Sequence, residues 1–530
     1  FFSSVLPSAA MAASSVGVVL LLLLRGRAWA LGDCFLGVDC GTQSLKALVY
    51  DTSTRRVVGR GSRSYEPVSS SPSEFEQDPA TWVTAMFEAC AEALREIPKD
   101  RVRGMGVSGQ QHGMVVLDAE GEPARRAKLW CDTSSRAEAA ELKEKTGWPF
   151  LVASFTSSKL LWLKRREPAI WKSVDKVLLP HDYLNYVLTG EFVAEWGDAS
   201  GTGLLDLKTK TWDSNACKMI DDDLEAKLPK LLGGPSEPCG RLRKDVAERL
   251  GLHQVLVSPG GGDNMMSAIG AGVTVRGRAA VSLGTSGTLF AKTTDDAPLD
   301  FFDADGIICP FLDSLGGGLP LVCTLNCANV PEEIRKAFGG EGRSEIAALA
   351  ALEPPGSEGV TMLPYFVGSR TPNWPQASAG IVGLRPNHLA RPGLLYRAAL
   401  EAATYSLKRG VVALEKNQGG SIDQVRLVGG ASKNLLWRQI VADVLQVDVA
   451  VPREPETAAL GAAIQAAAVV ALDGTTPDPD VASWILANHD APLDAIIHPD
   501  PNLADVYARA FDTFLHQGQA LFGGPGGASS

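Results

Sequence analysis

An internal repeat is the feature that most constrains the fold of this 530-residue chain. Segment 36–44 reads Leu-Gly-Val-Asp-Cys-Gly-Thr-Gln-Ser, and segment 281–287 reads Val-Ser-Leu-Gly-Thr-Ser-Gly. Each combines an apolar strand, a Gly-Thr turn and a returning strand, so each predicts a β-hairpin. Two such starts indicate two similar halves that meet near 274–278. Chance similarity of two Gly-Thr turns is the alternative.

Strands that alternate with helices predict a layered α/β fold. We expect strands at 35–38, 45–50, 102–108, 279–283, 288–292 and 425–428, and helices at 80–95, 436–444 and 456–472. The last helix is nearly all small and apolar, which predicts burial. Because 530 residues exceed one ordinary core, we expect two domains, with a third possible. Their bounds are 35–275 and 276–522, flanked by the segments 1–34 and 523–530.

The composition is that of a globular protein and argues against nucleic acid as a partner. The chain is 45% hydrophobic and 21% charged, with a formal net charge of -11 and no basic block. Such a protein would have to bind an anionic nucleotide locally, through backbone N–H groups and a metal ion. The nine cysteines are irregularly spaced and include no CxxC pair. Free thiols in a reducing compartment therefore fit better than a zinc site.

The N-terminal segment 1–34 is excluded from the fold prediction. It begins with Phe1, has a possible start at Met11, and carries an apolar run at 16–24 that is followed by two arginines and Ala-Trp-Ala. The run is too short to span a bilayer. It resembles the core of a signal or transit peptide, although no positive charge precedes it. An ill-defined gene start or a disordered tail is the alternative. We expect a cytoplasmic protein, or a plastid or other organellar one if this segment is a targeting peptide.

The run Gly260-Gly261-Gly262-Asp263-Asn264 carries the clearest chemical signal. Glycines allow a ligand to approach the backbone closely. A carboxylate in that place repels phosphate, so it suits accepting a proton, or holding a metal ion beside phosphate. The alternative is a glycine-rich turn whose Asp-Asn pair caps a helix over 265–272.

A third glycine turn, Gly429-Gly430-Ala431-Ser432, joins the strand at 425–428 to a helix. A helix that begins beside a glycine turn presents free N–H groups and is a common nucleotide site. The chain has no GxxxxGK[ST] loop, no GxGxxG after the first strand, no HExxH and no GxSxG. Three glycine turns and two isolated aspartates, Asp39 and Asp263, remain. They fit a nucleotide held between two halves, with metal ions among carboxylates and phosphates.

Taken together, these motifs resemble the FGGY family of carbohydrate kinases, and within it the bacterial-type xylulokinases. The resemblance covers about 35–522, and its elements follow the family's order. They are Gly37-Val38-Asp39-Cys40-Gly41-Thr42, Ser108-Gly109-Gln110-Gln111-His112-Gly113, Leu129-Trp130-Cys131-Asp132-Thr133, Asp182-Tyr183-Leu184 with Leu188-Thr189-Gly190-Glu191, Asp198-Ala199-Ser200-Gly201-Thr202, Gly262-Asp263-Asn264, Ser282-Leu283-Gly284-Thr285-Ser286-Gly287, Leu363-Pro364-Tyr365 with Arg370-Thr371-Pro372, and Gly429-Gly430-Ala431 with Leu436-Trp437-Arg438-Gln439.

The resemblance implies an actin-like ATPase fold, in which two ribonuclease-H-like domains enclose a cleft for nucleotide and sugar. The N-terminal domain would bind the sugar and the C-terminal domain ATP. The implied reaction moves the γ-phosphate of ATP to a sugar hydroxyl, which in xylulokinases is the 5-hydroxyl of D-xylulose. Mg²⁺ is the implied metal, a homodimer is possible, and no membrane or nucleic acid partner is implied.

Matching positions imply a role for individual residues. Asp263 would be the general base, and Asp39 would hold Mg²⁺ together with Asp263. The residues implied at the sugar are Gln111, His112, Trp130, Asp132 and Asn264. Those implied at ATP are Thr42, Gln43, Lys46, Gly284, Thr285, Gly430, Ala431 and Asn434.

Alternatives remain for several of these residues. His112 could be structural, Trp130 could belong to the core, and Lys46 could be a solvated strand charge. The chain also departs from the family, since many members carry Met at Gln111, Asn at Cys131 and Glu at Ser369. The Gln111 change leaves open another ketose or polyol, such as D-ribulose, L-ribulose or glycerol. A nucleotide-binding regulator of actin-like fold without transfer chemistry is a further alternative.

Overall fold

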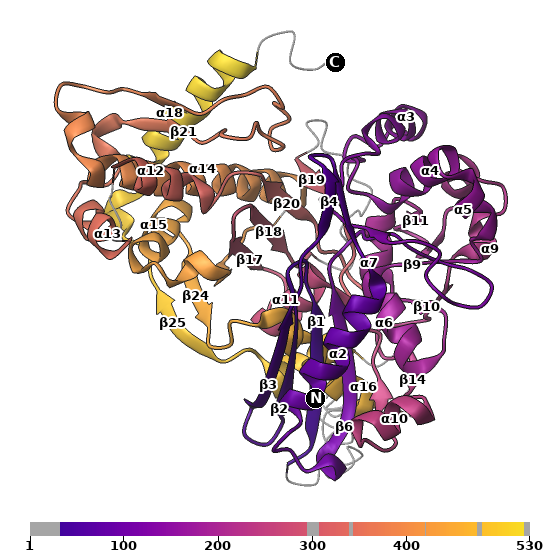
Figure 1. The fold of residues 1–530 in the computed structure, drawn as a ribbon. Coiled ribbons are helices and arrows are strands. Elements are labelled where there is room, and N and C mark those ends of the chain that lie inside the picture. The colour runs from indigo at the N-terminus through magenta and orange to yellow at the C-terminus, as the bar shows by residue number, and fades with distance from the viewer. Residues whose placement is uncertain (1–31, 294–306, 339–342, 419, 474–479, 524–530) are drawn as a thin grey trace, which may run out of the picture.

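The computed structural model describes residues 32–293, 307–338, 343–418, 420–473 and 480–523. These residues form two α/β domains, each built on a mixed sheet (Figure 1). The expected targeting-like segment lies outside the described residues except for positions 32–34, and so does the expected C-terminal tail beyond 523. Within the described part of the chain, no helix is both long and apolar enough to cross a membrane.

The first sheet has the strand order β14-β15-β6-β1-β2-β3, and β16 also pairs with β6. Strand β1 pairs antiparallel with β2 and parallel with β6. The strands are β1 Cys34–Cys40, β2 Ser44–Asp51, β3 Arg56–Ser64, β6 Val102–Gly109, β14 Gly240–Arg241, β15 Leu256–Val257 and β16 Gly261–Gly262. The main helices of this half are α2 Pro79–Ala93, α3 Arg136–Thr146, α4 Thr156–Arg166, α5 Pro168–Ser173, α6 Pro180–Thr189, α7 Trp196–Ala199, α10 Lys244–Leu250 and α11 Asp263–Ala271.

The second sheet has the order β19-β20-β18-β17-β23-β24-β25 and repeats the first. Strand β17 pairs antiparallel with β18 and parallel with β23, as β1 does with β2 and β6. The predicted internal repeat is therefore confirmed. The strands are β17 Arg278–Leu283, β18 Gly287–Ala291, β19 Ile308–Cys309, β20 Leu321–Thr324, β23 Gln424–Val428, β24 Asp448–Pro452 and β25 Leu493–Ile497, with β21 Thr361–Leu363 and β22 Gly380–Val382 in a separate pair. The helices in this part of the chain are α12 Asn329–Phe338, α13 Arg343–Ala351, α14 Pro392–Gln418, α15 Leu435–Leu445, α16 Thr457–Leu472, α17 Val481–His489 and α18 Ala504–Phe522.

Every strand and helix that the sequence predicts is present, with ends that agree within two residues. The hairpin β1–β2 closes as expected, since the Gly41 N–H donates to the Ser44 carbonyl at 3.0 Å. The third glycine turn contains a short 3₁₀ helix, Gly430–Lys433, before α15 begins. This extra turn comes from local hydrogen bonds and has no signature in hydrophobic periodicity.

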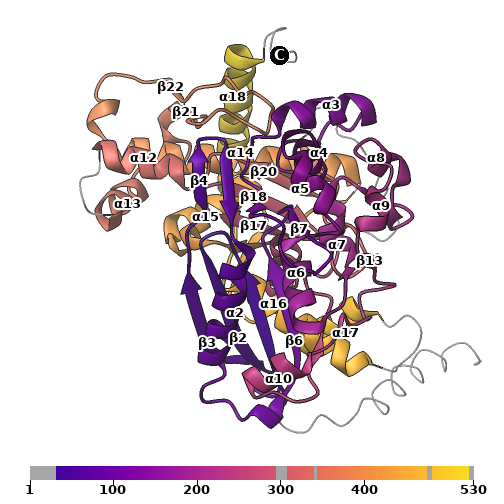
Figure 2. The same ribbon diagram turned by 45° about the vertical axis from the view of Figure 1, so that its right-hand side comes forward.

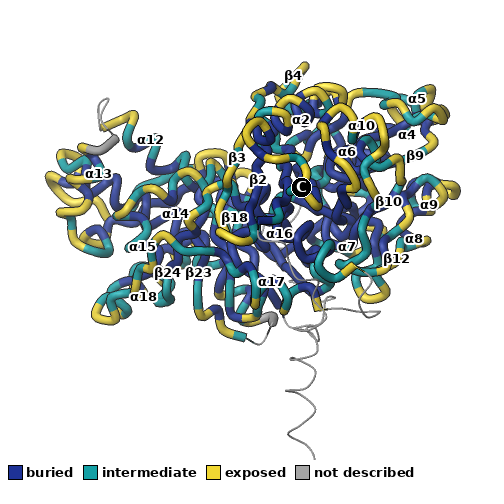
Figure 3. The backbone as a smooth tube through the Cα atoms, turned by 90° about the horizontal axis from the view of Figure 1, so that it is seen from below, coloured by how far each residue is buried: buried dark blue, intermediate teal, exposed yellow. Residues whose placement is uncertain are grey.

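Helix α16 lies far along the sequence but packs on the first sheet, against β1 and β6 (Figure 1). Figure 2 shows α17 beside it, and Figure 3 shows buried chain at the centre of both domains. Helix α16 also packs on α11, and there the two backbones touch directly. A Cβ built on Gly461 would lie 1.8 Å from the Met266 carbonyl oxygen, and one on Gly270 would lie 1.9 Å from the Thr457 carbonyl oxygen. Only glycine permits so close an approach.

The substitution Gly461→Ala tests this packing because the helix and its surroundings predict opposite signs. In an isolated helix the change would stabilise by about 1 kcal/mol, since alanine is the better helix former. Here the new Cβ has no room, so we expect overpacking to destabilise by about 1–3 kcal/mol. Calorimetry should show a lower melting temperature. The control is Gly380→Ala, where a Cβ would meet nothing within 4 Å. A melting temperature that is unchanged or raised in Gly461→Ala would contradict the packing.

Candidate active site

The two isolated aspartates sit where parallel strands end. In the register of the first sheet, Asp39 on β1 pairs with Ser108 on β6, and Ser108 pairs in turn with Gly261 on β16. The Ser108 hydroxyl donates to Asp39 Oδ1 at 2.8 Å. Ligands of open α/β sheets bind beyond the carboxyl ends of the strands. The sheet therefore brings Asp39 and the glycine run before Asp263 to one such edge.

The glycine run is held by a residue that the sequence analysis did not single out. Gly260 has a φ of 71°, and a Cβ there would lie 2.2 Å from the Val107 carbonyl oxygen. The buried amide of Gln465 on α16 accepts from the Gly260 N–H at 2.8 Å and donates to the Gly260 carbonyl at 3.1 Å. Gln465 is the only amide side chain in a helix of small apolar residues, and that isolation was the available signal.

Asp263 is the first residue of α11, and its side chain does not cap the helix. The N-cap is Gly262, which has no side-chain cap bond. Asp263 Oδ1 accepts from its neighbour Asn264 twice, from the backbone N–H at 2.8 Å and from Nδ2 at 3.1 Å. Among the hydrogen bonds of the described residues, Oδ2 has no donor. The capping alternative is therefore wrong, and one carboxylate oxygen is left for chemistry.

The charge of Asp39 disfavours the ionisation of Asp263. Burial, then the nearby Asp39 and Asp198, raise the pKa of Asp263 to about 8. Burial raises the pKa of Asp39 to about 6, against the lowering effects of the Ser108 hydroxyl and the Lys46 cation. Like charges this near are relieved by a cation placed between them. In the described ranges, no cluster of three or more His, Cys, Asp or Glu side chains could hold a metal ion.

His112 occupies a strained and tightly packed position. Its φ is 62°, in the left-handed region that residues with a Cβ rarely adopt. The ring stacks on Phe155, with centroids 5.1 Å apart and planes 14° apart, and also contacts Phe311 from the other half of the chain. Its Nδ1 lies 2.7 Å from the Gly201 carbonyl oxygen.

The protonation state of His112 follows from these contacts. Burial, then the cations Lys159 and Arg370, lower its pKa to about 3, so the ring is neutral at pH 7. A carbonyl oxygen only accepts, so Nδ1 must carry the proton and donate to Gly201. The other nitrogen, Nε2, is then a hydrogen-bond acceptor. His112 is thus a fixed acceptor and does not act as an acid at this pH.

Gln111 lies between Asn264 and a buried pair formed by His181 and Asp198. Asn264 Nδ2 donates to Gln111 Oε1 at 2.6 Å. On its other side, the Gln111 amide approaches Asp198 closely enough to lower the pKa of that carboxyl, although burial raises it well above the ordinary range overall. His181 Nδ1 lies 2.7 Å from Asp198 Oδ2. In the sequence, Asp198 is recognisable only as part of a motif and His181 carries no signal, because the pairing is between two helices and leaves no local pattern.

Trp130 and Thr42 lie side by side. Trp130 is 40% exposed, so the core alternative for this residue is wrong. Its Nε1–H donates to Thr42 Oγ1 at 2.9 Å, and the Thr42 hydroxyl donates to Gln110 Oε1 at 3.2 Å. These contacts join the predicted sugar wall to the Gly-Thr turn of the first hairpin.

Asp132 is fully buried, and its carboxylate is already saturated. Oδ2 accepts from Lys128 Nζ and from the Phe75 N–H, both at 3.0 Å, while Oδ1 accepts from the N–H and hydroxyl of Ser134. The pKa of Asp132 is lowered by these donors, despite burial. The side chain therefore anchors the loop after Trp130.

Two predicted ATP-binding residues of the first half, Lys46 and Gln43, differ in their surroundings. Lys46 Nζ pairs with Glu456 Oε2, just before α16, at 2.5 Å, so Lys46 is not an isolated solvated charge. Gln43 is exposed at the tip of the hairpin.

The glycine turns of the second half pack together. A Cβ on Gly429 would lie 2.8 Å from the Leu283 carbonyl oxygen, so the third turn abuts the second. Backbone N–H groups near the start of α12 donate to the carbonyls of Gly284 and Thr285. Asn434 caps α15, since its Oδ1 accepts from the N–H of Trp437 at 3.2 Å. The predicted residues Gly284, Thr285, Gly430, Ala431 and Asn434 thus belong to two adjoining turns.

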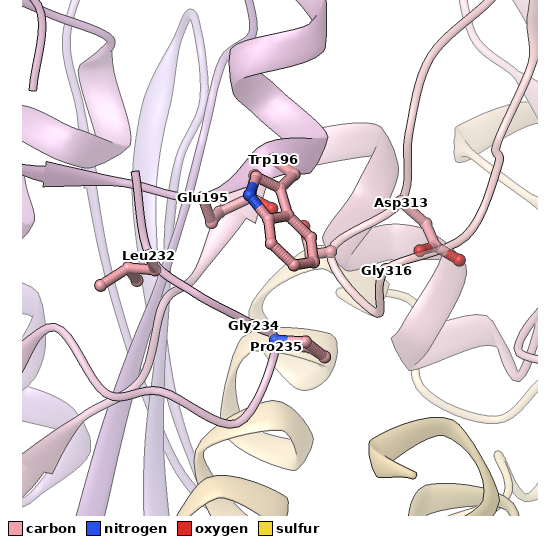
Figure 4. Close-up of a pocket in the computed structure, with 8 residues that line it drawn as sticks. Glu195, Trp196, Leu232, Gly234, Pro235, Asp313 and Gly316 are labelled. Carbon is pink, nitrogen blue, oxygen red and sulfur yellow. The ribbon is translucent and has the colours of Figure 1, made fainter. Parts of the chain in front are cut away.

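Figure 4 shows a loop of the second half, which carries Asp313 and Gly316, beside Glu195 and Trp196 of the first half. The cavity between them has a volume of about 10 Å³. That is roughly the space of one water molecule, so it is a packing gap. The loop is tied down by Lys210 Nζ, which donates to the Gly316 carbonyl at 2.7 Å.

Two α/β domains that repeat one hairpin motif define an actin-like ATPase fold. The chain matches the family model "FGGY family of carbohydrate kinases, N-terminal domain" over residues 34–270 and the corresponding C-terminal domain over residues 279–470. The chain belongs to the FGGY family of carbohydrate kinases. It is a carbohydrate kinase that binds a sugar substrate and a nucleotide, and FGGY kinases use ATP.

Relatives of the chain are similar over most of its length. A xylulose kinase of Haemophilus influenzae is 39% identical over 450 residues, which are 82% of this chain and 90% of that protein. One of Streptomyces rubiginosus is 37% identical, covering 86% and 91%. A solved structure from Brucella ovis, described as a "xyloylose kinase", is 32% identical with a TM-score of 0.83, covering 92% and 99%.

The raised pKa of Asp263 predicts a pH-dependent gain in stability for Asp263→Asn. The folded pKa is about 8 against an ordinary value of 3.8, so the folded state holds a proton that the unfolded state has lost between these pH values. The contribution of Asp263 to the stability of the parent protein therefore falls as pH rises from about 4 to about 8. Asparagine cannot ionise. The melting temperature of Asp263→Asn should therefore exceed that of the parent protein, and the difference should grow as the pH rises through this window.

The measurement is differential scanning fluorimetry from pH 5 to 8.5 without metal or nucleotide. Asp494→Asn, which also removes one negative charge but at an exposed position on β25, is the control. A difference in melting temperature between Asp263→Asn and the parent that stays constant with pH would contradict the raised pKa.

Proposed function

We propose that this carbohydrate kinase phosphorylates D-xylulose at its 5-hydroxyl to give D-xylulose 5-phosphate. The observation that carries the proposal is Asp263 Oδ2, which accepts no hydrogen bond from the described residues and lies beside the hydrogen-bonding side chains of Asn264 and Gln111. A basic oxygen next to groups that pair with hydroxyls suits deprotonation of a sugar. The relatives named xylulose kinases support this choice of sugar.

Asp263 is the general base in this proposal. As the sugar hydroxyl oxygen attacks the γ-phosphorus of ATP, its proton passes to Asp263 Oδ2 and the bond to the β-phosphate oxygen breaks. Oδ1 stays bonded to Asn264, which fixes the direction of Oδ2. With a pKa of about 8, Asp263 is mostly protonated near neutral pH when no cation is near. A cation beside it would favour the carboxylate form, which is the form that accepts the proton.

The carboxylates of Asp39 and Asp263 fit Mg²⁺ as the metal. Both are hard oxygen donors. The charge of Asp39 raises the pKa of Asp263, and a cation would relieve this repulsion. Mg²⁺ usually takes one or two carboxylates together with substrate phosphates, so a cluster of three protein ligands is not required. When bound, Mg²⁺ would neutralise charge that develops on the phosphates. Asp39 would hold it, directly or through water, with its own orientation fixed by Ser108.

The nucleotide would lie along the three glycine turns. Thr42, Gln43 and Lys46 would face the phosphates from the first half, with Lys46 exchanging its contact with Glu456 for a phosphate oxygen. Gly284 and Thr285 would contact the β- and γ-phosphates. Gly430, Ala431 and Asn434 would border the adenosine.

The sugar would contact His112, Asn264 and the exposed edge of Trp130. His112 Nε2 would accept from one sugar hydroxyl, because its Nδ1–H is committed to Gly201. Gln111 and Asp132 would support the pocket, since Gln111 Oε1 and the Asp132 carboxylate already accept hydrogen bonds from protein donors.

A panel of acceptors tests the choice of sugar. We expect D-xylulose to have a higher kcat/KM than D-ribulose, L-ribulose, glycerol and D-fructose in a coupled ADP assay. A pocket built to pair a hydroxyl rejects an analogue that inverts or lacks it, by up to about 10⁴-fold, since the buried polar groups lose their partners. If D-ribulose or glycerol exceeds D-xylulose by about tenfold, the choice of xylulose is wrong while sugar kinase activity stands.

A further inference from the structure

Lys159 is a buried amine that the proposed reaction does not use, and burial lowers its pKa to about 7. It lies on α4 with a relative exposure of 0%, and none of the carboxylates in the described residues comes within ion-pair distance of its Nζ. Instead, Nζ donates to two backbone carbonyls, that of His112 at 2.8 Å and that of Ser154 at 2.5 Å. Burying an ammonium group without a carboxylate is unfavourable, so its partners have to compensate.

One of those partners is the strained residue of the proposed sugar pocket. The carbonyl of His112 also accepts from Thr156 Oγ1 at 3.2 Å, so two side chains of the first turns of α4 converge on it. A left-handed backbone at a residue with a Cβ persists only where its surroundings fix it. At His112 those surroundings are the ring contacts with Phe155 and Gly201 and the two donors from α4.

We propose that Lys159 is the positioning residue of the sugar pocket, which holds the backbone of His112 in its left-handed conformation and so fixes where Nε2 meets the sugar. The inference rests on the proposed sugar-binding role of His112. Lys159 itself contacts the carbonyl of His112 and acts through that residue. The positive charge also helps to keep the imidazole neutral, in the same direction as Arg370.

Lys159→Met removes the ammonium group and keeps most of the apolar side-chain volume. We expect the KM for D-xylulose to rise about tenfold, which corresponds to the loss of one hydrogen bond that orients a binding group. The KM for ATP should stay within about twofold, because the glycine turns are unaffected. A purely structural loss would instead lower the amount of active enzyme, and so kcat, without separating the two KM values.

Lys164→Met is the matched control. Lys164 lies on the same helix and also donates to a backbone carbonyl, that of Ile220 at 2.6 Å, but it has no contact with His112. This variant should leave both KM values unchanged. Thr156→Val removes the second donor to the same carbonyl and should raise the KM for D-xylulose by about threefold, as expected for a neutral hydrogen bond. It carries the test if Lys159→Met does not fold.

A double-mutant cycle with His112→Ala separates this inference from the proposed function. If Lys159 acts through His112, Lys159→Met should add nothing to the sugar KM in the His112→Ala background. An equal effect of Lys159→Met with and without His112, or no effect on the sugar KM, would overturn the positioning role. A sugar KM that His112→Ala leaves unchanged would instead overturn the pocket on which the inference rests.

Discussion

The packing of α16 against the first domain is the constraint on which the rest of the structure depends. This helix comes late in the chain, but it contacts β1 and β6 and meets α11 backbone to backbone at Gly461 and Gly270. From the same helix, the Gln465 side chain makes two hydrogen bonds with the backbone of Gly260. The position of Asp263 at the start of α11 is therefore fixed by a segment about two hundred residues away, which ties the two halves of the sequence into one site.

Electrostatics at this site favours reactivity at the expense of stability. The carboxylates of Asp39 and Asp198 are close enough to Asp263 to raise its pKa. Asp39 accepts a hydrogen bond from Ser108, and Asp198 lies within hydrogen-bond distance of His181. A protein that needed only a stable fold would not gather carboxylates at one sheet edge. Perturbed pKa values of this kind are common in functional sites, where a base must work near neutral pH. Binding of phosphates and a cation would change the same balance.

Much of the fold could be predicted from the sequence, because strand and helix periodicity and the two Gly-Thr turns are local signals. The candidate residues Asp39, Asp263 and His112 were also predicted, since motifs carry them. Contacts between distant segments were not. The amide of Gln465 looked like one polar residue in an apolar helix, the pair of His181 and Asp198 joins two helices, and Lys159 sits in an ordinary amphipathic pattern. Nor could the saturation of Asp132 by Lys128 be deduced, because it depends on three-dimensional packing.

We propose that Asp263 is the base of phosphoryl transfer, and the turnover of Asp263→Asn is a direct test of this role. Asparagine keeps the size and the contact with Asn264 but has no basic oxygen. We expect D-xylulose-dependent ATP consumption to fall by about 10³-fold, within the range for loss of general-base catalysis, while ATP binding measured by calorimetry persists. Turnover within about tenfold of the parent enzyme, with ATP binding intact, would show that Asp263 is not the general base.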